Sequence, residues 1–251
     1  MAEHQLQRTE MLLGAEGLRR LAACRAAVFG LGGVGGYAAE ALARSGVGAL
    51  DLIDHDRISV TNLNRQILAL HSTVGQYKTD VAKARIQDIA PDCKVRTYAM
   101  FILPDTADQF DFSQYDCVID AIDTVTGKLT IIEKAKDAGV PVISVMGTGN
   151  KLDPTKLKIA DLYETSACPL ARVMRRECRK RGITDLKVVY SEEEPIRPQR
   201  KAEAEAEDTG NPDEAPAKRR KDVPGSLAFV PAAAGMAAAS AAVRELLGLK
   251  C

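Results

Sequence analysis

The chain has 251 residues and 46% of them are apolar, so it is long enough and apolar enough to bury a core of its own. Its 34 lysines and arginines balance 34 aspartates and glutamates, which excludes a polycation that binds nucleic acid through overall charge alone. Aromatic residues make up 4% of the chain and tryptophan is absent, which argues against a platform that stacks several bases.

Cysteine spacing and apolar segments indicate the compartment. The six cysteines contain no pair at C-x-x-C spacing, so neither a zinc knuckle nor a disulfide framework is expected. The N-terminal residues lack the basic-then-apolar pattern of a leader peptide. The longest apolar run, 227–243, is rich in alanine and contains Pro231 and Gly235, so we expect a helix packed on the core. These features predict a cytoplasmic protein without stable membrane insertion.

Short apolar strands alternate with helical patterns through the first 145 residues. After a short helix at 14–23, the patterns predict strands at 26–29, 49–53, 94–98, 117–120 and 140–145, and helices at 34–45, 79–89 and 126–138. This alternation is typical of parallel β-α-β units. It predicts an α/β fold with a doubly wound, mostly parallel sheet.

One segment interrupts this pattern. Residues 198–222 contain no large apolar side chain and carry blocks of opposite charge, which is typical of a flexible insertion. Beyond it, the pattern predicts a strand at 225–230 and a final helix at 232–247, so the chain returns to the core. We therefore predict a single domain over residues 1–251, with a charged flexible insertion at 198–222.

A glycine-rich turn lies between the first strand of the sheet and the helix that follows. Its glycines would let a phosphate approach backbone N–H groups at the start of that helix; they are Gly30, Gly32, Gly33 and Gly35. Asp54 ends the next strand, 19 residues after Gly35, where a carboxylate is expected to bind both ribose hydroxyls. The pattern predicts a nucleotide site and leaves NAD and ATP both open; a glycine turn needed only for packing is the structural alternative.

The residues after Asp54 favour ATP. Arg65 in the polar loop and Lys78 at the next helix could hold a triphosphate and neutralise an α-phosphate under attack, whereas hydride transfer needs neither cation. Asp120 and Asp123 follow a later strand at the ligand-binding edge, and their spacing suits a magnesium ion that bridges phosphates. Each charge alone could be a surface residue or a helix cap, but the combination predicts ATP and Mg²⁺ as cofactors.

Together these motifs resemble the adenylating fold of ThiF, MoeB and the ubiquitin-activating enzymes, over about residues 8–145. The resemblance implies that Asp54 holds the ribose, that Asn62, Arg65 and Lys78 contact phosphates, and that Asp123 binds magnesium-ATP. It also places Arg8 where the family has an arginine that reaches into a partner subunit's site, which implies a homodimer. The full candidate ATP-binding set is Gly30, Gly32, Gly33, Gly35, Asp54, Asp56, Asn62, Arg65, Gln66, Lys78, Asp120 and Asp123.

The second half resembles the tRNA threonylcarbamoyladenosine dehydratase branch of this family. The similar segments are 147–155, 168–176, 188–191 and 225–231, and the missing C-x-x-C zinc pairs of MoeB-type members favour the same branch. This resemblance implies a tRNA substrate that carries threonylcarbamoyladenosine. ATP would adenylate its carboxylate, and ring closure would release AMP. The implied catalytic residues are Arg65, Lys78, Asp123 and Arg8, with Asp123 and Asp120 as metal ligands.

RNA contact has its own candidate. Four arginines share one face of a predicted helix, and four like charges on one face favour a bound anion such as RNA phosphate; they are Arg172, Arg175, Arg176 and Arg179. The alternative is a solvated helix with Glu177 and other acids nearby.

The sequence leaves open a role in sulfur transfer and the identity of the group that is adenylated. Cys168 is the best-placed thiol for a role after adenylation, and a cysteine desulfurase is a candidate sulfur-transfer partner. A competing hypothesis is an adenylyltransferase that activates the C-terminal Gly-Gly of a small ubiquitin-like sulfur carrier. A third is an NAD-dependent oxidoreductase or a nucleotide sensor, although the chain has no Tyr-x-x-x-Lys motif or paired histidine that favours it.

Overall fold

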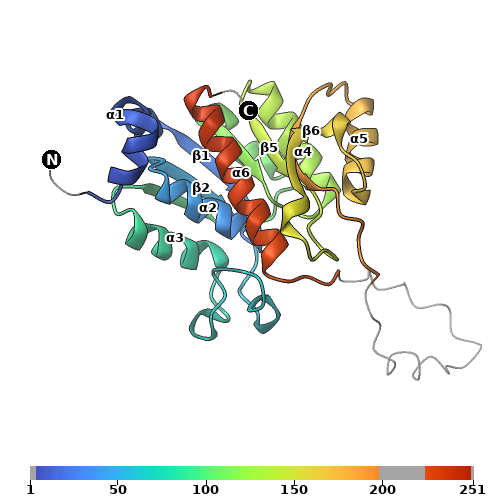
Figure 1. Ribbon diagram of the computed structural model, residues 1–251, viewed down its shortest axis with the longest axis horizontal. Helices are drawn as coiled ribbons and strands as arrows, with labels where there is room; N and C mark the ends of the chain where they lie inside the picture. Colours follow the sequence, from blue (N-terminus) through green and yellow to red (C-terminus); the bar gives the residue numbers. More distant parts are fainter. Residues whose placement is uncertain (1–3, 198–223, 250–251) are drawn as a thin grey trace, which may run out of the picture.

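The computed structural model describes residues 4–197 and 224–249. Over these ranges the chain forms a seven-stranded sheet with the strand order β3-β2-β1-β4-β5-β7-β6 (Figure 1). All neighbouring strands run parallel except β6 and β7, which are antiparallel. The predicted doubly wound, mostly parallel α/β fold is therefore confirmed. The strands are β1 Arg25–Phe29, β2 Ala49–Ile53, β3 Lys94–Tyr98, β4 Cys117–Asp120, β5 Val142–Val145, β6 Leu157–Asp161 and β7 Lys187–Ser191.

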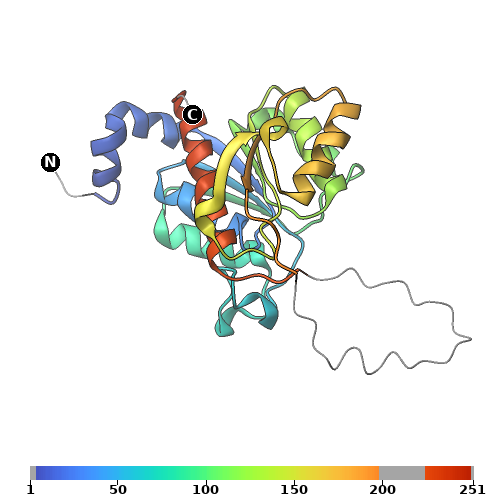
Figure 2. The ribbon, with the colours of Figure 1, turned by 45° about the vertical axis from the view of Figure 1, so that its right-hand side comes forward.

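Helices cover both faces of this sheet. Helices α2, α3 and α6 pack on one face, with α1 beside the end of α6, and α4 and α5 cover the other (Figures 1 and 2). Their bounds are α1 Gln7–Ala23, α2 Gly35–Arg44, α3 Lys78–Ile89, α4 Val125–Asp137, α5 Pro169–Lys180 and α6 Phe229–Leu247.

Strand β1 illustrates why the central strands read as continuous apolar runs. Side chains alternate between the two faces of a strand, so Val28 enters the core beneath α2 and α6, whereas Phe29 enters the core on the opposite face. There, the Phe29 ring stacks on Phe112 with ring centroids 5.6 Å apart. Residues 26–29 of β1 are therefore apolar at every position, because both faces of this strand are covered.

The alanine-rich run packs on the core as expected. Gly235 of α6 lies so close to α2 that a Cβ atom there would be 2.3 Å from the Val34 carbonyl oxygen. The small residues of α6 therefore allow two helix backbones to approach closely. Within residues 4–197 and 224–249, no helix is both long and apolar enough to cross a membrane.

The chain departs from the predicted elements in several places. The strand predicted at 225–230 is wrong, because residues 224–227 are irregular and α6 already begins at Phe229. Pro231 lies in the first turn of α6, where its missing N–H costs no helical hydrogen bond. Helix α1 starts at Gln7 instead of 14 and is kinked at Gly14, and strands β6 and β7 were not predicted. The charged insertion predicted at 198–222 lies outside the described residues.

Candidate active site

A cavity of about 440 Å³ opens at the carboxyl ends of the central strands. It lies next to β1 and β4, which are neighbours in the sheet although the chain leaves them in opposite directions. Ligands of doubly wound sheets bind at such a switch point. Ten of the twelve predicted ATP-binding residues line the cavity, and Gly35 and Asp120 do not; the ten are Gly30, Gly32, Gly33, Asp54, Asp56, Asn62, Arg65, Gln66, Lys78 and Asp123.

The glycine turn forms one end of this cavity. Gly35 is the first residue of α2, and a Cβ atom there would lie 1.7 Å from the Gly30 carbonyl oxygen. No other residue type fits this position without moving the turn. The turn thereby places Gly32, Gly33 and Val34, directly before α2, in the cavity lining, where backbone N–H groups at the helix N-terminus can bind a phosphate.

Asp54 connects the end of β2 to the glycine turn. Its Oδ2 accepts a hydrogen bond from the Leu31 backbone N–H at 2.6 Å, and its Oδ1 accepts one from the Asp56 N–H at 2.8 Å. Both bonds fix the direction of a buried carboxylate that lines the cavity. An acid held in this way can accept hydrogen bonds from ribose hydroxyls, as the sequence predicts.

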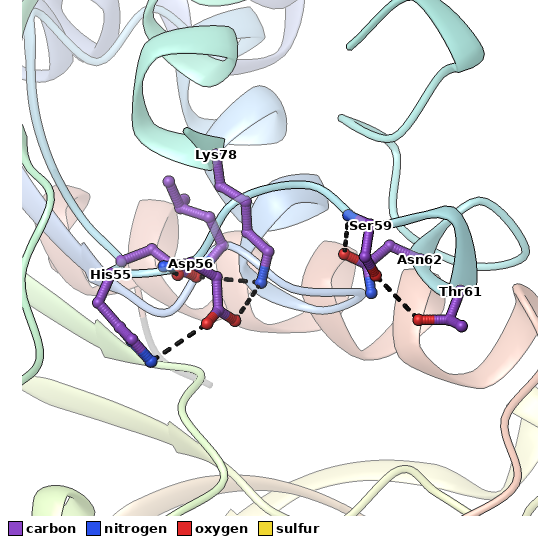
Figure 3. A network of polar contacts seen from close by, with 8 residues as sticks. His55, Asp56, Ser59, Thr61, Asn62 and Lys78 are labelled. Carbon is purple, nitrogen blue, oxygen red and sulfur yellow. Dashed lines mark hydrogen bonds and ion pairs between the residues drawn. The ribbon is translucent and has the colours of Figure 1, made fainter. Parts of the chain in front are cut away.

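Lys78 reaches into the cavity from the start of α3 (Figure 3). Its side chain is nearly buried, and its Nζ lies 2.6 Å from Asp56 Oδ2 and 3.7 Å from Asp54 Oδ2. His55 Nε2 lies 3.1 Å from the other oxygen of Asp56. Asp54, His55 and Asp56 have their ligand atoms within 4.8 Å of one another, but the Lys78 ammonium already lies against both carboxylates. The Lys78 ammonium therefore reaches the cavity with the half-exposed Asp56 carboxylate as its nearest partner.

The loop that carries Arg65 is held by its own hydrogen bonds. Asn62 Oδ1 accepts the Ser59 N–H at 3.1 Å (Figure 3). Arg65 Nη1 donates to the Thr61 carbonyl at 3.0 Å and to Asn64 Oδ1 at 2.9 Å. One nitrogen of the guanidinium is thus anchored at the cavity, and the group keeps further N–H donors for a phosphate.

Gln66 is the buried polar side chain of this wall. It is 7% exposed, and its Oε1 has no hydrogen-bond partner. A buried acceptor without a partner is costly, so a ligand that donates a hydrogen bond here would be stabilised.

The two candidate magnesium ligands differ in their surroundings. Asp123 lines the cavity with an exposed carboxylate that has no ion-pair partner among the described residues. Asp120 is completely buried, and its Oδ2 accepts hydrogen bonds from Lys128 Nζ at 3.0 Å and from Ser144 Oγ at 2.5 Å. The donor set therefore fits a metal ligand at Asp123 and does not fit one at Asp120.

Helix α5 does not present its four arginines as one surface. Arg175 turns toward the body of the protein, where its Nη1 donates to the Thr165 carbonyl at 2.9 Å and to the Thr165 hydroxyl. Arg172, Arg176 and Arg179 are exposed, although the Arg179 guanidinium lies 5.2 Å from the centre of the Tyr163 ring. Arg176 is also paired with Glu177, whose Oε1 lies 3.0 Å from Arg176 Nε, so a nucleic acid would compete with this carboxylate for Arg176.

Neither Arg8 nor any cysteine among the described residues lines the cavity. Burial raises the pKa of Cys117 to about 12 and the pKa values of Cys93 and Cys178 to about 11, so none of these is a thiolate at neutral pH. Cys168 is buried at the start of α5. Arg8 is exposed on α1 and does not line the cavity of its own chain.

The sequence-based site residues omit one wall of the cavity. This wall contains three residues that follow β5, namely Gly147, Thr148 and Gly149. It also contains Pro224 and Ser226, which lie about 75 residues later in the chain, just before α6. The signal for the first three was present, because they directly follow a predicted strand and the carboxyl ends of strands form the binding edge. For Pro224 and Ser226 there was no local signal.

The comparisons with known proteins agree with this geometry. The ThiF family matches the chain over residues 4–251. The tRNA threonylcarbamoyladenosine dehydratase of Bacillus subtilis is 45% identical over 97% of this chain and 95% of that protein, and the Escherichia coli protein of the same name is 39% identical over 76% and 74%. Crystal structures of the E. coli enzyme, TcdA, superpose with TM-scores of 0.83 for its AMP complex and 0.84 for its ATP complex.

These two superpositions cover 96% and 97% of this chain, and 93% and 94% of the E. coli chain, at 34% and 33% identity. The likeness therefore includes both halves of the molecule, not the glycine turn alone. The chain belongs to the ThiF family and, within it, to the tRNA threonylcarbamoyladenosine dehydratase group.

Proposed function

We propose that this chain is an ATP-dependent tRNA threonylcarbamoyladenosine dehydratase. The threonyl carboxylate of the modified adenosine attacks the α-phosphorus of ATP and releases pyrophosphate. The carbamoyl group of the same nucleoside then attacks the activated carbonyl and gives up a proton. The ring bond forms as the bond to AMP breaks, so over both steps the base loses the elements of one water. The observation that carries the proposal is the convergence of Arg65, Lys78 and Asp123, from three separate segments, on one cavity beside the glycine turn.

The chain's own groups supply positioning and charge for the first step. The glycine turn and the start of α2 bind phosphate oxygens, while Asp54 accepts hydrogen bonds from the ribose. Arg65 and Lys78 neutralise the negative charge on the oxygens of the α-phosphate as the carboxylate attacks its phosphorus. Lys78 is already desolvated and close to its working position, so its exchange of Asp56 for a phosphate needs only a side-chain movement.

The second step requires little from the protein. Ring closure within one nucleoside has a high effective concentration, so activation of the carboxylate is the main task. No protein nucleophile is needed, and the raised pKa values of Cys93, Cys117 and Cys178 agree with a mechanism without a thiolate.

Magnesium is assigned to Asp123. Mg²⁺ is usually bound by one or two carboxylates together with substrate phosphates, and Asp123 is a free carboxylate at the cavity. When bound, the ion would neutralise charge on the phosphates. Asp120 is left out of this assignment because its carboxylate is already engaged by Lys128 and Ser144.

The remaining assignments concern partners. We assign tRNA phosphate contacts to Arg172, Arg176 and Arg179 and give Arg175 a supporting role through Thr165. Because Arg8 lies outside the cavity of its own chain, its role in catalysis requires a homodimer in which it enters the partner's site. A cytoplasmic location and a cysteine-desulfurase partner stay predictions from the sequence.

The test uses tRNA that carries threonylcarbamoyladenosine, ATP and the purified protein, with mass spectrometry of the digested nucleosides. We expect the modified nucleoside to lose one water in the presence of ATP, and Arg65→Ala to abolish this loss. A protein that binds ATP but leaves the nucleoside unchanged would contradict the proposal. Pyrophosphate exchange that depends on a Gly-Gly protein tail, instead of on the tRNA, would favour the adenylyltransferase hypothesis.

A further inference from the structure

We infer that Asn150 is a positioning residue that fixes the cavity wall on which the acceptor nucleoside binds. The inference rests on the proposed function and deepens it, because it divides the cavity between its two substrates. Asn150 directly follows the Gly147–Gly149 segment, which lines the cavity. Asn150 itself does not line the cavity, so it acts through its neighbours.

The two walls of the cavity differ in chemistry. The wall formed by β2, the following loop and α3 carries charged side chains, among them Asp54, Arg65 and Lys78. Five other lining residues carry no charged side chain, and we call them the uncharged wall; they are Gly147, Thr148, Gly149, Pro224 and Ser226. Phosphates bind the cations, whereas the exposed peptide groups of the uncharged wall suit the hydrogen-bonding edges of a nucleobase. The uncharged wall is therefore the acceptor side.

Asn150 holds this wall together through three hydrogen bonds. Its backbone N–H donates to the Gly225 carbonyl at 2.7 Å, and its Oδ1 accepts the Gly225 N–H, also at 2.7 Å. Its carbonyl accepts the Ile196 N–H at 2.7 Å. Two segments that are distant in the sequence are thus anchored to one residue.

The same wall is tied to the nucleotide side at its other end. The Ser226 carbonyl accepts a hydrogen bond from Asn64 Nδ2 at 2.9 Å, and Asn64 Oδ1 in turn accepts one from Arg65. Residues 224–226 therefore extend from Asn150 to the loop of Arg65. A shift at Asn150 would move the acceptor wall relative to the cation that acts on the α-phosphate.

The backbone conformation explains why asparagine suits this position. Asn150 has a φ of +59°, in the left-handed region that most side chains avoid and that glycine, asparagine and aspartate tolerate. Glycine would keep the conformation but lose the Oδ1 acceptor. Aspartate would keep both, and alanine would keep neither. The three substitutions therefore separate the backbone contribution from the side-chain contribution.

The experiment measures steady-state turnover of the modified tRNA by Asn150→Gly, Asn150→Asp and Asn150→Ala, together with ATP affinity by calorimetry. Loss of one hydrogen bond predicts that Asn150→Gly raises KM for the tRNA roughly fivefold to tenfold. ATP affinity should stay within about twofold, because no contact of Asn150 reaches the cation-bearing wall directly. Asn150→Asp should restore KM close to the wild-type value, and Asn150→Ala should show the largest increase.

A second variant removes the same hydrogen bond from its donor side. Gly225→Pro deletes the N–H group that Asn150 Oδ1 accepts, without a change in the loop after β5. It should raise KM for the tRNA as Asn150→Gly does, and it keeps the test decisive if Asn150→Gly does not fold. An unchanged KM for the tRNA in both variants, or equal losses of tRNA and ATP affinity, would overturn the inference while wild-type turnover still supported the proposed function. No turnover by the wild-type protein would overturn the proposed function, and the inference with it.

Discussion

Two lysine–aspartate pairs lie close to the cavity at the carboxyl ends of β1 and β4 and differ in their access to water. Lys128 of α4 and Asp120 of β4 are both 0% exposed and are 3.0 Å apart. Lys78 of α3 is 4% exposed, but its partner Asp56 has a side chain that is 49% exposed. Both pairs join a lysine to an aspartate at a similar distance, but only the second pair has an aspartate in contact with water.

The difference in exposure separates a lysine that stabilises the fold, Lys128, from a lysine that can meet a ligand, Lys78. Lys128 Nζ also donates to the Val145 carbonyl at 2.7 Å, so the buried pair joins the carboxyl ends of β4 and β5 beneath the cavity. A change of partner there would leave an unpaired charge away from water, which is costly. Lys78 can exchange Asp56 for a phosphate, because Asp56 returns to water when it is released. Burial of the aspartate thus decides which lysine is available to a substrate.

The largest expected effect is a loss of stability when the buried Lys128–Asp120 pair is broken. Lys128→Met leaves the Asp120 carboxylate buried without its cation, so the free energy of unfolding should fall by about 3–5 kcal/mol, measured by chemical denaturation. The double variant Lys128→Met/Asp120→Asn should recover part of this loss, because no unpaired charge remains. A single variant as stable as the wild type would remove the distinction between the two pairs.

The next effect is on turnover at the cavity. Lys78→Met should lower the rate of ATP–pyrophosphate exchange about 10²- to 10³-fold, because it removes one cation from the α-phosphate, while the protein remains folded. Lys83→Met on the same helix, but outside the cavity lining, is the matched control and should keep full exchange. Normal exchange by Lys78→Met would exclude this lysine from the mechanism.

A smaller effect on tRNA binding is expected from helix α5. There too, an exposed charged residue, Arg176, can be compared with one that is bonded to the protein, Arg175. Arg176→Glu should raise KM for tRNA roughly threefold to tenfold at low salt, and the difference should shrink as salt increases. Arg175→Ala should mainly lower the melting temperature, because Arg175 is bonded to Thr165. Lys94→Glu on β3, at the opposite edge of the sheet from β6, controls for net charge. Equal effects of Arg176→Glu and Lys94→Glu on KM would argue against a specific tRNA surface.

The smallest effect concerns pH. Burial alone would raise the pKa of Glu40, but hydrogen bonds from Arg85 and Arg44 outweigh it and lower the pKa below its usual value of 4.5. A lowered carboxyl pKa stabilises the fold above that usual value, and this contribution disappears as pH falls through the pKa of the folded state. Glu40→Gln should therefore cost about 1 kcal/mol or less at pH 7. The difference in melting temperature should shrink as pH falls below 4.5 and through the lowered pKa of the folded state; a difference that stays constant with pH would contradict this account.

The regular part of the fold could be predicted because its signals are local. The first five strands and helices α2 to α4 have short apolar runs or helical periodicity between glycines, and each was found near its observed position. Strand β6 is a half-buried edge strand, Leu157–Asp161, and its mixed sequence carries no clear alternation. The apolar run 225–230 has no period that separates a strand from the start of a helix, and packing against α2 selected the helix.

In the candidate site too, features with a local sequence signal could be predicted and features that depend on distant residues could not. Arg65 and Lys78 belong to recognisable motifs in the segment that follows β2, and Asp123 follows β4, so their convergence could be anticipated. The burial of Asp120 could not, because it depends on Lys128 and on Ser144, 24 residues away on the neighbouring strand.

The sequence alone determines the doubly wound sheet, the glycine turn and a set of charged residues suited to ATP. Each of these features depends on neighbours within a few residues. Only the tertiary structure decided which of these charges face the cavity and which are buried beneath it. It also decided that Asn150 meets Gly225, 75 residues later. Hydrogen bonds between distant segments depend on how whole elements pack, and no local pattern encodes that packing.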